Sequence, residues 1–239
     1  MHLPHLLFLM TAVTGASVAQ DTKLSPVIEL FSSEGCSSCP PAERVISSLN
    51  AEQSQGDDTP IIIVYAVDYW NRLGWVDPFS DRRHSVRQEH YAKWGVSKMF
   101  TPALIINGST TVVGSDEPAV REALAAARGT SARSVLQLTV DWKADTVTGT
   151  ISSDRSAAGV TYSIALVQDG VEQKIPRGEN RGRTLIHDRL CRAIVTLAST
   201  GRWVLPLPQP ADRAASHIVA FEQQDATGLI LGARQISCK

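Results

Sequence analysis

The pattern of apolar and polar positions changes character near residue 130. Up to there, short apolar runs alternate with stretches of helical periodicity, and the strongest run spans 61–67. A continuous, β-branched run of this kind is typical of a central strand buried on both faces. The pattern predicts strands at 27–31, 61–67, 102–106 and 110–114, and helices at 40–50, 81–94 and 117–128.

Turn residues support these boundaries. Asn107-Gly108 separates two of the predicted strands and is the strongest short signal for a hairpin. Pro118 falls in the first turn of the last predicted helix, and Gly129 follows its end. The order of elements is therefore β-α-β-α-β-β-α.

From Ser131 onward, apolar and polar residues alternate between turn signals. Such alternation is typical of strands with one buried face, and many short strands in succession favour an all-β module such as a small sandwich. The predicted strands are 135–140, 146–151, 160–168, 192–197, 203–207, 217–222 and 229–236. We therefore predict two domains, an α/β domain at 24–129 and a β-rich domain at 131–239.

Composition indicates a folded protein that does not bind nucleic acid through charge. Hydrophobic residues make up 43% and charged residues 20%, which indicates a packed globular chain, and the net charge of −1 argues against binding nucleic acid through phosphate contacts.

Residues 1–19 resemble a secretory signal peptide, with an apolar core at 6–13 and the small-x-small end Ser17-Val18-Ala19. The alternative is an ordinary apolar N-terminal segment. We expect export to the periplasm, and no other stretch reaches the ~20 apolar residues of a membrane span.

The main chemical feature is the pair Cys36 and Cys39, which follows a predicted strand and opens a predicted helix. A thiol at a helix N-terminus faces unpaired N–H groups and the positive end of the helix dipole, and both stabilise the reactive thiolate. We expect Cys36 to be the nucleophile and Cys39 to resolve the mixed disulfide. Two cysteines alone could also be half of a zinc site.

The second feature is Thr101-Pro102, placed between a helix end and an apolar strand. Together with the cysteine pair, it resembles the segment of the thioredoxin superfamily that carries a cis-proline beside the redox centre. The resemblance implies a thioredoxin-like fold for the N-terminal domain, a mixed sheet flanked by helices. It also implies that Pro102 is cis and that Thr101 contacts the substrate chain.

Longer runs narrow the resemblance to a family of bacterial exported proteins, domain of unknown function 1223 (DUF1223). The runs are 30–43, 67–79, 101–102, 178–185 and 230–233. Membership implies a thioredoxin-like fold and no established substrate.

Other polar and aromatic residues are candidates for the site. Asp68 follows the central strand at its carboxyl end, and Trp70 comes from the same aromatic-rich loop, so both could form a substrate surface. They could equally cap the core and a turn. For Glu34 we favour a role in shaping the turn. The charged run 179–183 is either a solvated hairpin tip or an anion or partner site.

The remaining cysteines, Cys191 and Cys238, lie in the C-terminal part. Leftover cysteines of an exported protein most often pair, so we expect a structural bridge between them. Two separate buried thiols are the alternative.

These observations favour thiol–disulfide exchange with protein or small-thiol partners, without a cofactor or a resident metal. Two other functions stay open. Cys36 and Cys39 could hold copper or zinc as thiolates, or the protein could bind partners without redox chemistry.

Overall fold

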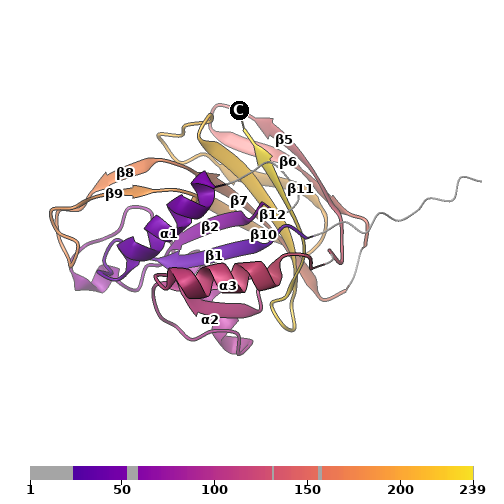
Figure 1. Cartoon of the computed structure of the whole chain (residues 1–239). Coiled ribbons are helices and arrows are strands. Elements are labelled where there is room, and N and C mark those ends of the chain that lie inside the picture. Colours follow the sequence, from indigo (N-terminus) through magenta and orange to yellow (C-terminus); the bar gives the residue numbers. More distant parts are fainter. Residues whose placement is uncertain (1–23, 53–58, 131, 156–157, 239) are drawn as a thin grey trace, which may run out of the picture.

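Figure 1 shows the computed structural model, which describes residues 24–52, 59–130, 132–155 and 158–238. Its helices are α1 (Cys39–Ala51), α2 (Arg82–Lys93) and α3 (Glu117–Ala127), with the short 3-10 helix η1 (Asn71–Leu73). Within these ranges, no helix has both the length and the apolar character needed to cross a membrane. The predicted signal peptide, residues 1–19, falls outside the described residues and stays a prediction.

The architecture is mixed α/β and is dominated by one sheet of eight strands, in the order β13-β12-β7-β10-β2-β1-β3-β4. These strands are β1 (Val27–Ser32), β2 (Ile61–Ala66), β3 (Ala103–Ile106), β4 (Thr110–Val113), β7 (Val160–Gln168), β10 (Leu190–Leu197), β12 (Ser216–Gln224) and β13 (Ile230–Ser237). A second sheet has the order β11-β6-β5 and contains β5 (Leu136–Trp142), β6 (Thr146–Ser153) and β11 (Gly201–Pro206).

The two predicted units, 24–129 and 131–239, share the large sheet. Strand β10 from the second half lies parallel to β2 from the first, with Leu190 opposite Val64. The Val64 N–H donates to the carbonyl oxygen of Arg189 over 2.9 Å. Four of the predicted C-terminal strands thus extend the sheet of the first half, while three others form the second sheet.

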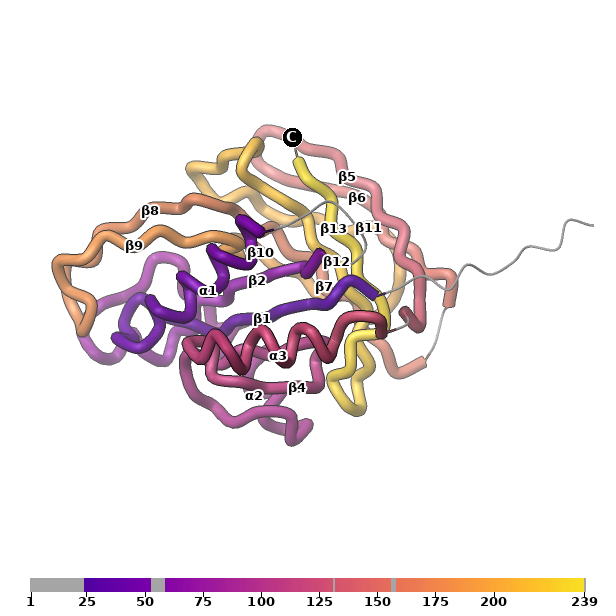
Figure 2. Tube along the Cα trace, in the orientation of Figure 1, coloured from indigo at the N-terminus to yellow at the C-terminus, as the bar shows by residue number. Residues whose placement is uncertain are grey.

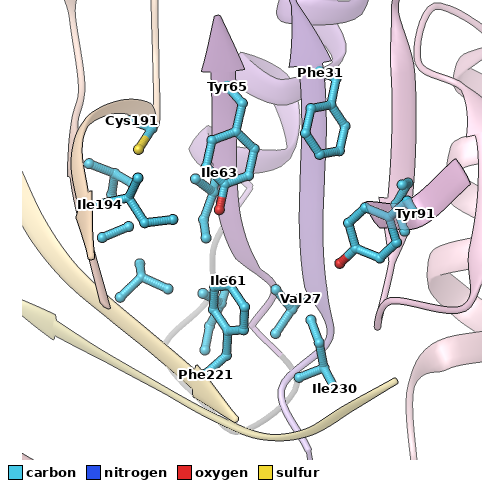
Figure 3. Packing of buried hydrophobic residues seen from close by; sticks show 14 of the residues in the cluster. Val27, Phe31, Ile61, Ile63, Tyr65, Tyr91, Cys191, Ile194, Phe221 and Ile230 are labelled. Atoms are coloured by element: carbon cyan, nitrogen blue, oxygen red, sulfur yellow. The ribbon is translucent and has the colours of Figure 1, made fainter. Parts of the chain in front are cut away.

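Alternation along the strands divides the core between the two faces of the large sheet. On β1, Ile28 and Leu30 face α1 and α3, whereas Val27 and Phe31 face the side of α2. The β5-β6-β11 sheet packs further along the same face as α1 and α3, over β7 and β12. Figure 3 shows the opposite face, where Phe31 stacks on Tyr65 with ring centroids 5.3 Å apart.

The predicted hairpin at Asn107-Gly108 is confirmed. Three residues, 107–109, connect β3 to β4, and the Ser109 N–H donates to the Ile106 carbonyl around Asn107 and Gly108. Both central residues have positive φ, 50° and 67°, as this turn requires. A side chain at Gly108 would also meet the carbonyl oxygen of Gly228 at 1.9 Å. Glycine therefore satisfies both the turn geometry and a close approach to the C-terminal half.

The sequence analysis offered a hairpin tip for 179–183 but predicted no strands on either side of it. Strands β8 (Val171–Lys174) and β9 (Thr184–His187) form a separate antiparallel hairpin, with Val171 opposite His187. Figure 2 shows this hairpin, in orange, leaving the large sheet and running alongside α1. The charged run 179–183 forms part of its tip.

The expected bridge between Cys191 and Cys238 is wrong, because both residues are free, buried thiols. Cys191 packs on the α2 side of the large sheet, and Cys238 packs on the opposite side, against the second sheet. In addition, β10 and β13 are separated by β7 and β12. Three strand spacings of ~4.8 Å exceed the ~7 Å between Cα atoms that a disulfide can span.

We therefore expect the unreduced protein to show two reactive thiols, at Cys191 and Cys238, once it is unfolded in guanidinium. The native protein should react slowly, because burial raises the pKa of the Cys191 thiol to about 12 and keeps reagents away. Thiol titration followed by mass mapping of the labelled peptides measures both quantities. Absence of label at these positions after unfolding would show that they are bridged.

Candidate redox site

The cysteine pair lies where β1 ends and α1 begins. A turn after β1 places the Cys36 N–H 3.1 Å from the Ser33 carbonyl, and the Cys39 N–H lies 3.2 Å from the Cys36 carbonyl. Cys36 and Cys39 form a disulfide with their Cα atoms 5.4 Å apart. The helix starts at Cys39, so Cys36 lies in the turn that leads into it.

The predicted substrate-contacting segment lies beside this disulfide. The Thr101–Pro102 peptide bond is cis, as predicted, and the Cys36 Sγ lies 3.9 Å from the Thr101 carbonyl oxygen. Trp70 joins them, because its Nε1–H donates to the Thr101 hydroxyl over 2.8 Å. A side chain at Gly35 would come within 3.1 Å of the Trp70 Cβ, so glycine lets the tryptophan pack against the cysteine turn.

Asp68 is hydrogen-bonded to α2 rather than to the cysteine turn. Its carboxylate accepts a hydrogen bond from the Ser85 hydroxyl of α2, and its own N–H donates to the same hydroxyl oxygen over 3.1 Å. Of the predicted surface residues, the structure therefore brings Thr101, Pro102 and Trp70 to Cys36 and anchors Asp68 to α2.

Beside the pair lies a cluster of buried charged groups. His187 at the end of β9 places its Nδ1 2.6 Å from the Glu43 carboxylate and its Nε2 3.2 Å from the Glu34 carboxylate. Glu43 lies on α1 one turn after Cys39, and both are buried on that helix. The Trp75 indole N–H donates to Glu34 over 2.7 Å. The cluster therefore connects the cysteine turn, α1, the aromatic loop and the β8–β9 hairpin.

Ionisation in this cluster follows from its burial and its neighbours. Burial alone would lower the pKa of His187, but the Glu43 and Glu34 carboxylates outweigh it and raise the pKa to about 10. His187 is thus a buried cation at neutral pH. Burial, and next the negative charge of Glu34, raise the pKa of Asp77 to about 6. The Asp77 carboxylate also accepts the Glu34 N–H over 3.0 Å.

The hairpin tip packs against the backbone of the cysteine turn. Asn180, fully buried, donates through its side-chain amide to the carbonyl oxygens of Glu34 and Cys36, over 2.8 and 2.9 Å. The Glu179 carboxylate accepts the Ser37 N–H over 2.9 Å. Cys36 is only 1% exposed. In this conformation no attacking group can reach its sulfur.

The sequence analysis missed Glu43, His187 and Asn180 as parts of the site. One signal was present, because Glu43 occupies an otherwise apolar, buried face of α1 with Ala42, Val45 and Ile46. An ionisable residue on such a face requires a buried partner. The role predicted for Glu34, shaping the turn, omitted its contact with His187. Across the described residues, no group of three or more His, Cys, Asp or Glu side chains is arranged to hold a metal ion.

The fold makes this chain a mixed α/β protein. The cysteine pair before a helix, beside a cis Thr–Pro bond, gives it a candidate redox site. The chain belongs to the family described as protein of unknown function (DUF1223), whose model matches residues 27–223.

Two solved structures show a similar fold. The protein AGR_C_4864 from Agrobacterium tumefaciens is 24% identical, with a TM-score of 0.63, and the alignment covers 90% of this chain and 95% of that one. HBP35 of Porphyromonas gingivalis is 13% identical with a TM-score of 0.67, over 90% of this chain and 75% of that one. No curated protein matches the sequence.

The charge of His187 predicts how the free energy of unfolding depends on pH. Its folded pKa of about 10 lies above the ordinary histidine value, so the folded state keeps a proton that the unfolded state releases. The stabilisation is complete below about pH 6.5 and is lost as the pH rises through 10, by about 1.4 kcal/mol per pH unit between these limits. Denaturant unfolding of wild type and His187→Gln across this range should show the stability difference shrinking toward high pH. A constant difference would mean that His187 is not a buried cation.

Proposed function

We propose that this protein is an exported, thioredoxin-like thiol–disulfide oxidoreductase that acts through Cys36 and Cys39. The observation that carries the proposal is the position of Cys36, before the N-terminus of α1 and 3.9 Å from the carbonyl of Thr101 in a cis Thr–Pro segment. The helix terminus favours a thiolate in the reduced protein. The backbone at Thr101 offers polar groups to a partner chain beside the reacting sulfur.

The exchange proceeds in two steps. The Cys36 thiolate attacks one sulfur of a partner disulfide, which forms a mixed disulfide and releases the other partner sulfur as a thiolate that takes up a proton. The Cys39 thiolate then attacks the Cys36 sulfur, which forms the Cys36–Cys39 disulfide and releases the second partner thiol. The partner gains two electrons and two protons, and the reverse sequence oxidises a dithiol partner.

Exposed apolar side chains occur on the loop that carries Trp70 and on the segment before Thr101. Leu73 and Val76, from the loop that carries Trp70, are 47% and 68% exposed, and Met99, two residues before Thr101, is 42% exposed. Large apolar side chains left in water on segments that contribute to the candidate site favour a partner that covers them. We therefore propose protein thiols or disulfides as partners, with small thiols as a second class.

Exchange requires Cys36 to become accessible, because it is buried, and the hairpin tip is the segment from the second half of the chain that is hydrogen-bonded to the cysteine turn. The contacts that hold the tip are few, and Gly178 and Gly182 stand on either side of Glu179 and Asn180 with φ of 79° and 80°. Glycine at both ends allows this short segment to change backbone conformation at low cost. We propose that a partner displaces Glu179 and Asn180 from the cysteine turn.

Replacing Cys39 tests the exchange chemistry. In Cys39→Ser, the remaining Cys36 thiolate can attack a partner but nothing releases it, so adducts that a reductant cleaves should accumulate in the compartment where the protein acts. Non-reducing gel electrophoresis with mass identification detects them. The Cys36→Ser/Cys39→Ser protein should give none, and Cys191→Ser should resemble wild type, because Cys191 lies in the core.

The rival functions predict other results. A metal-binding module predicts no adducts, and instead one equivalent of copper or zinc in the reduced protein, lost on replacing Cys36 or Cys39. A partner-binding protein without redox chemistry predicts neither adducts nor bound metal.

Replacing Asn180 tests whether the contacts of the hairpin tip limit access to the disulfide. Asn180→Ala removes two hydrogen bonds to backbone carbonyls, which costs roughly 1–3 kcal/mol and favours the open state by roughly 5- to 150-fold. The rate at which dithiothreitol reduces the Cys36–Cys39 disulfide should rise accordingly. Glu172→Ala, an exposed position of β8 in the same hairpin, is the matched control. Equal rates for wild type, control and Asn180→Ala would show that the tip does not limit access.

A further inference from the structure

A cavity of about 720 Å³ lies between α2 and the face of the large sheet formed by β7, β10 and β12. Its lining includes no residue of the cysteine turn, of the Thr101–Pro102 segment or of the hairpin tip. The volume falls within the ~300–1,000 Å³ typical of small-molecule sites, which often form where two parts of a fold meet. Here α2 comes from the first half of the chain and the strands come from the second.

The α2 wall of this cavity carries a row of basic side chains. Arg82, Arg83, Arg87, His90 and Lys93 all line it, at spacings that place them along one side of the helix. The acidic lining residue is Asp225, and its backbone carbonyl accepts the indole N–H of Trp94 over 2.8 Å. Among the charged side chains that line the cavity, most are therefore basic.

These cations differ in how firmly they are already paired. Arg87 is committed to the fully buried carboxylate of Glu29. Arg82 is paired with Glu89 and Arg83 with Asp81, but both arginines are more than half exposed, and such pairs contribute only ~0–1 kcal/mol. Lys93 has no ion-pair partner within the part of the chain that the structure describes. An incoming anion can thus bind Lys93 and share the exposed guanidinium groups.

The ionisation of His90 agrees with a positive environment. Burial, and next the charges of Lys93 and Arg87, lower the pKa of His90. The imidazole therefore stays neutral at pH 7, and it can donate a hydrogen bond to an anion without adding charge.

The rest of the lining is apolar or carries hydroxyl groups. Val86 of α2, Trp94 at the C-terminal end of α2 and Ile194 of β10 provide apolar side chains. The hydroxyls come from the large sheet, at Thr161, Ser163 and Thr196. A flat apolar body suits the space beside Trp94, and an anionic group suits the α2 wall.

We propose that this cavity binds a small soluble organic anion, with a carboxylate or sulfonate attached to an aromatic or similarly flat apolar body. The site is independent of the thiol chemistry of Cys36 and Cys39, so it stands whether or not the proposed exchange activity does.

Two fluorescent probes of similar shape separate the contributions of charge and apolar contact. Anilinonaphthalenesulfonate carries the anionic group, and N-phenylnaphthylamine is its uncharged counterpart. We expect the native protein to bind one molecule of either probe. Lys93→Glu should lower the affinity for the sulfonate probe by roughly tenfold, about 1.4 kcal/mol, and leave the affinity for the neutral probe unchanged. Thr196→Trp, which fills the cavity from β10, should abolish binding of both.

Two controls place the binding in this cavity. Lys98→Glu reverses an exposed charge outside the lining and should affect neither probe, and Cys36→Ser/Cys39→Ser should bind both probes as wild type does. The proposal would be overturned if Lys98→Glu and Lys93→Glu lost the same affinity for the sulfonate probe, or if a folded Thr196→Trp protein still bound both probes fully. Absence of stoichiometric binding to wild type would also overturn it.

Discussion

The buried imidazolium of His187 between the carboxylates of Glu34 and Glu43 is the interaction on which the arrangement of the candidate redox site depends. Charged groups removed from water must be paired, and breaking a buried pair by removing one partner costs roughly 3–5 kcal/mol. The three groups come from the turn before Cys36, from α1 and from β9. None of these segments can shift alone without leaving a charge unpaired. The hairpin is thus fixed to the cysteine pair at its base, while its tip is held by neutral amide contacts and one exposed carboxylate.

The contacts at the base and at the tip of the hairpin differ in strength. At the base, Glu43 also accepts a hydrogen bond of 2.5 Å from Ser32, and Trp75 satisfies a second oxygen of Glu34. At the tip, hydrogen bonds to neutral groups contribute less and can be exchanged for water or for a partner. If a partner displaces the tip as proposed, the charged base can keep its geometry while Cys36 becomes accessible.

Local features of the sequence were enough to predict much of the first half of the chain. The helix that starts at Cys39 and the turn at Asn107-Gly108 each depend on short segments with distinctive residues. The cis bond before Pro102 was predicted from the resemblance to the thioredoxin superfamily. The joining of β10 to β2 depends on residues far apart in sequence and leaves no local pattern. Hairpin β8–β9 was missed because its strands are short and mostly partly exposed or exposed. The bridge between Cys191 and Cys238 was inferred from cysteine usage, which carries no information about which sheet face each residue occupies.

The parallel pairing of β10 with β2 also has a consequence for the order in which the molecule assembles. A nascent chain emerges N-terminus first, and contacts between distant segments form late. Strand β2 therefore waits with one open edge, and the cysteine turn waits uncovered, until the segment that carries the hairpin and β10 has been made. In that interval Cys36 and Cys39 are accessible to any oxidant or thiol nearby. The chemistry that closes their disulfide has its easiest opportunity before the fold is complete.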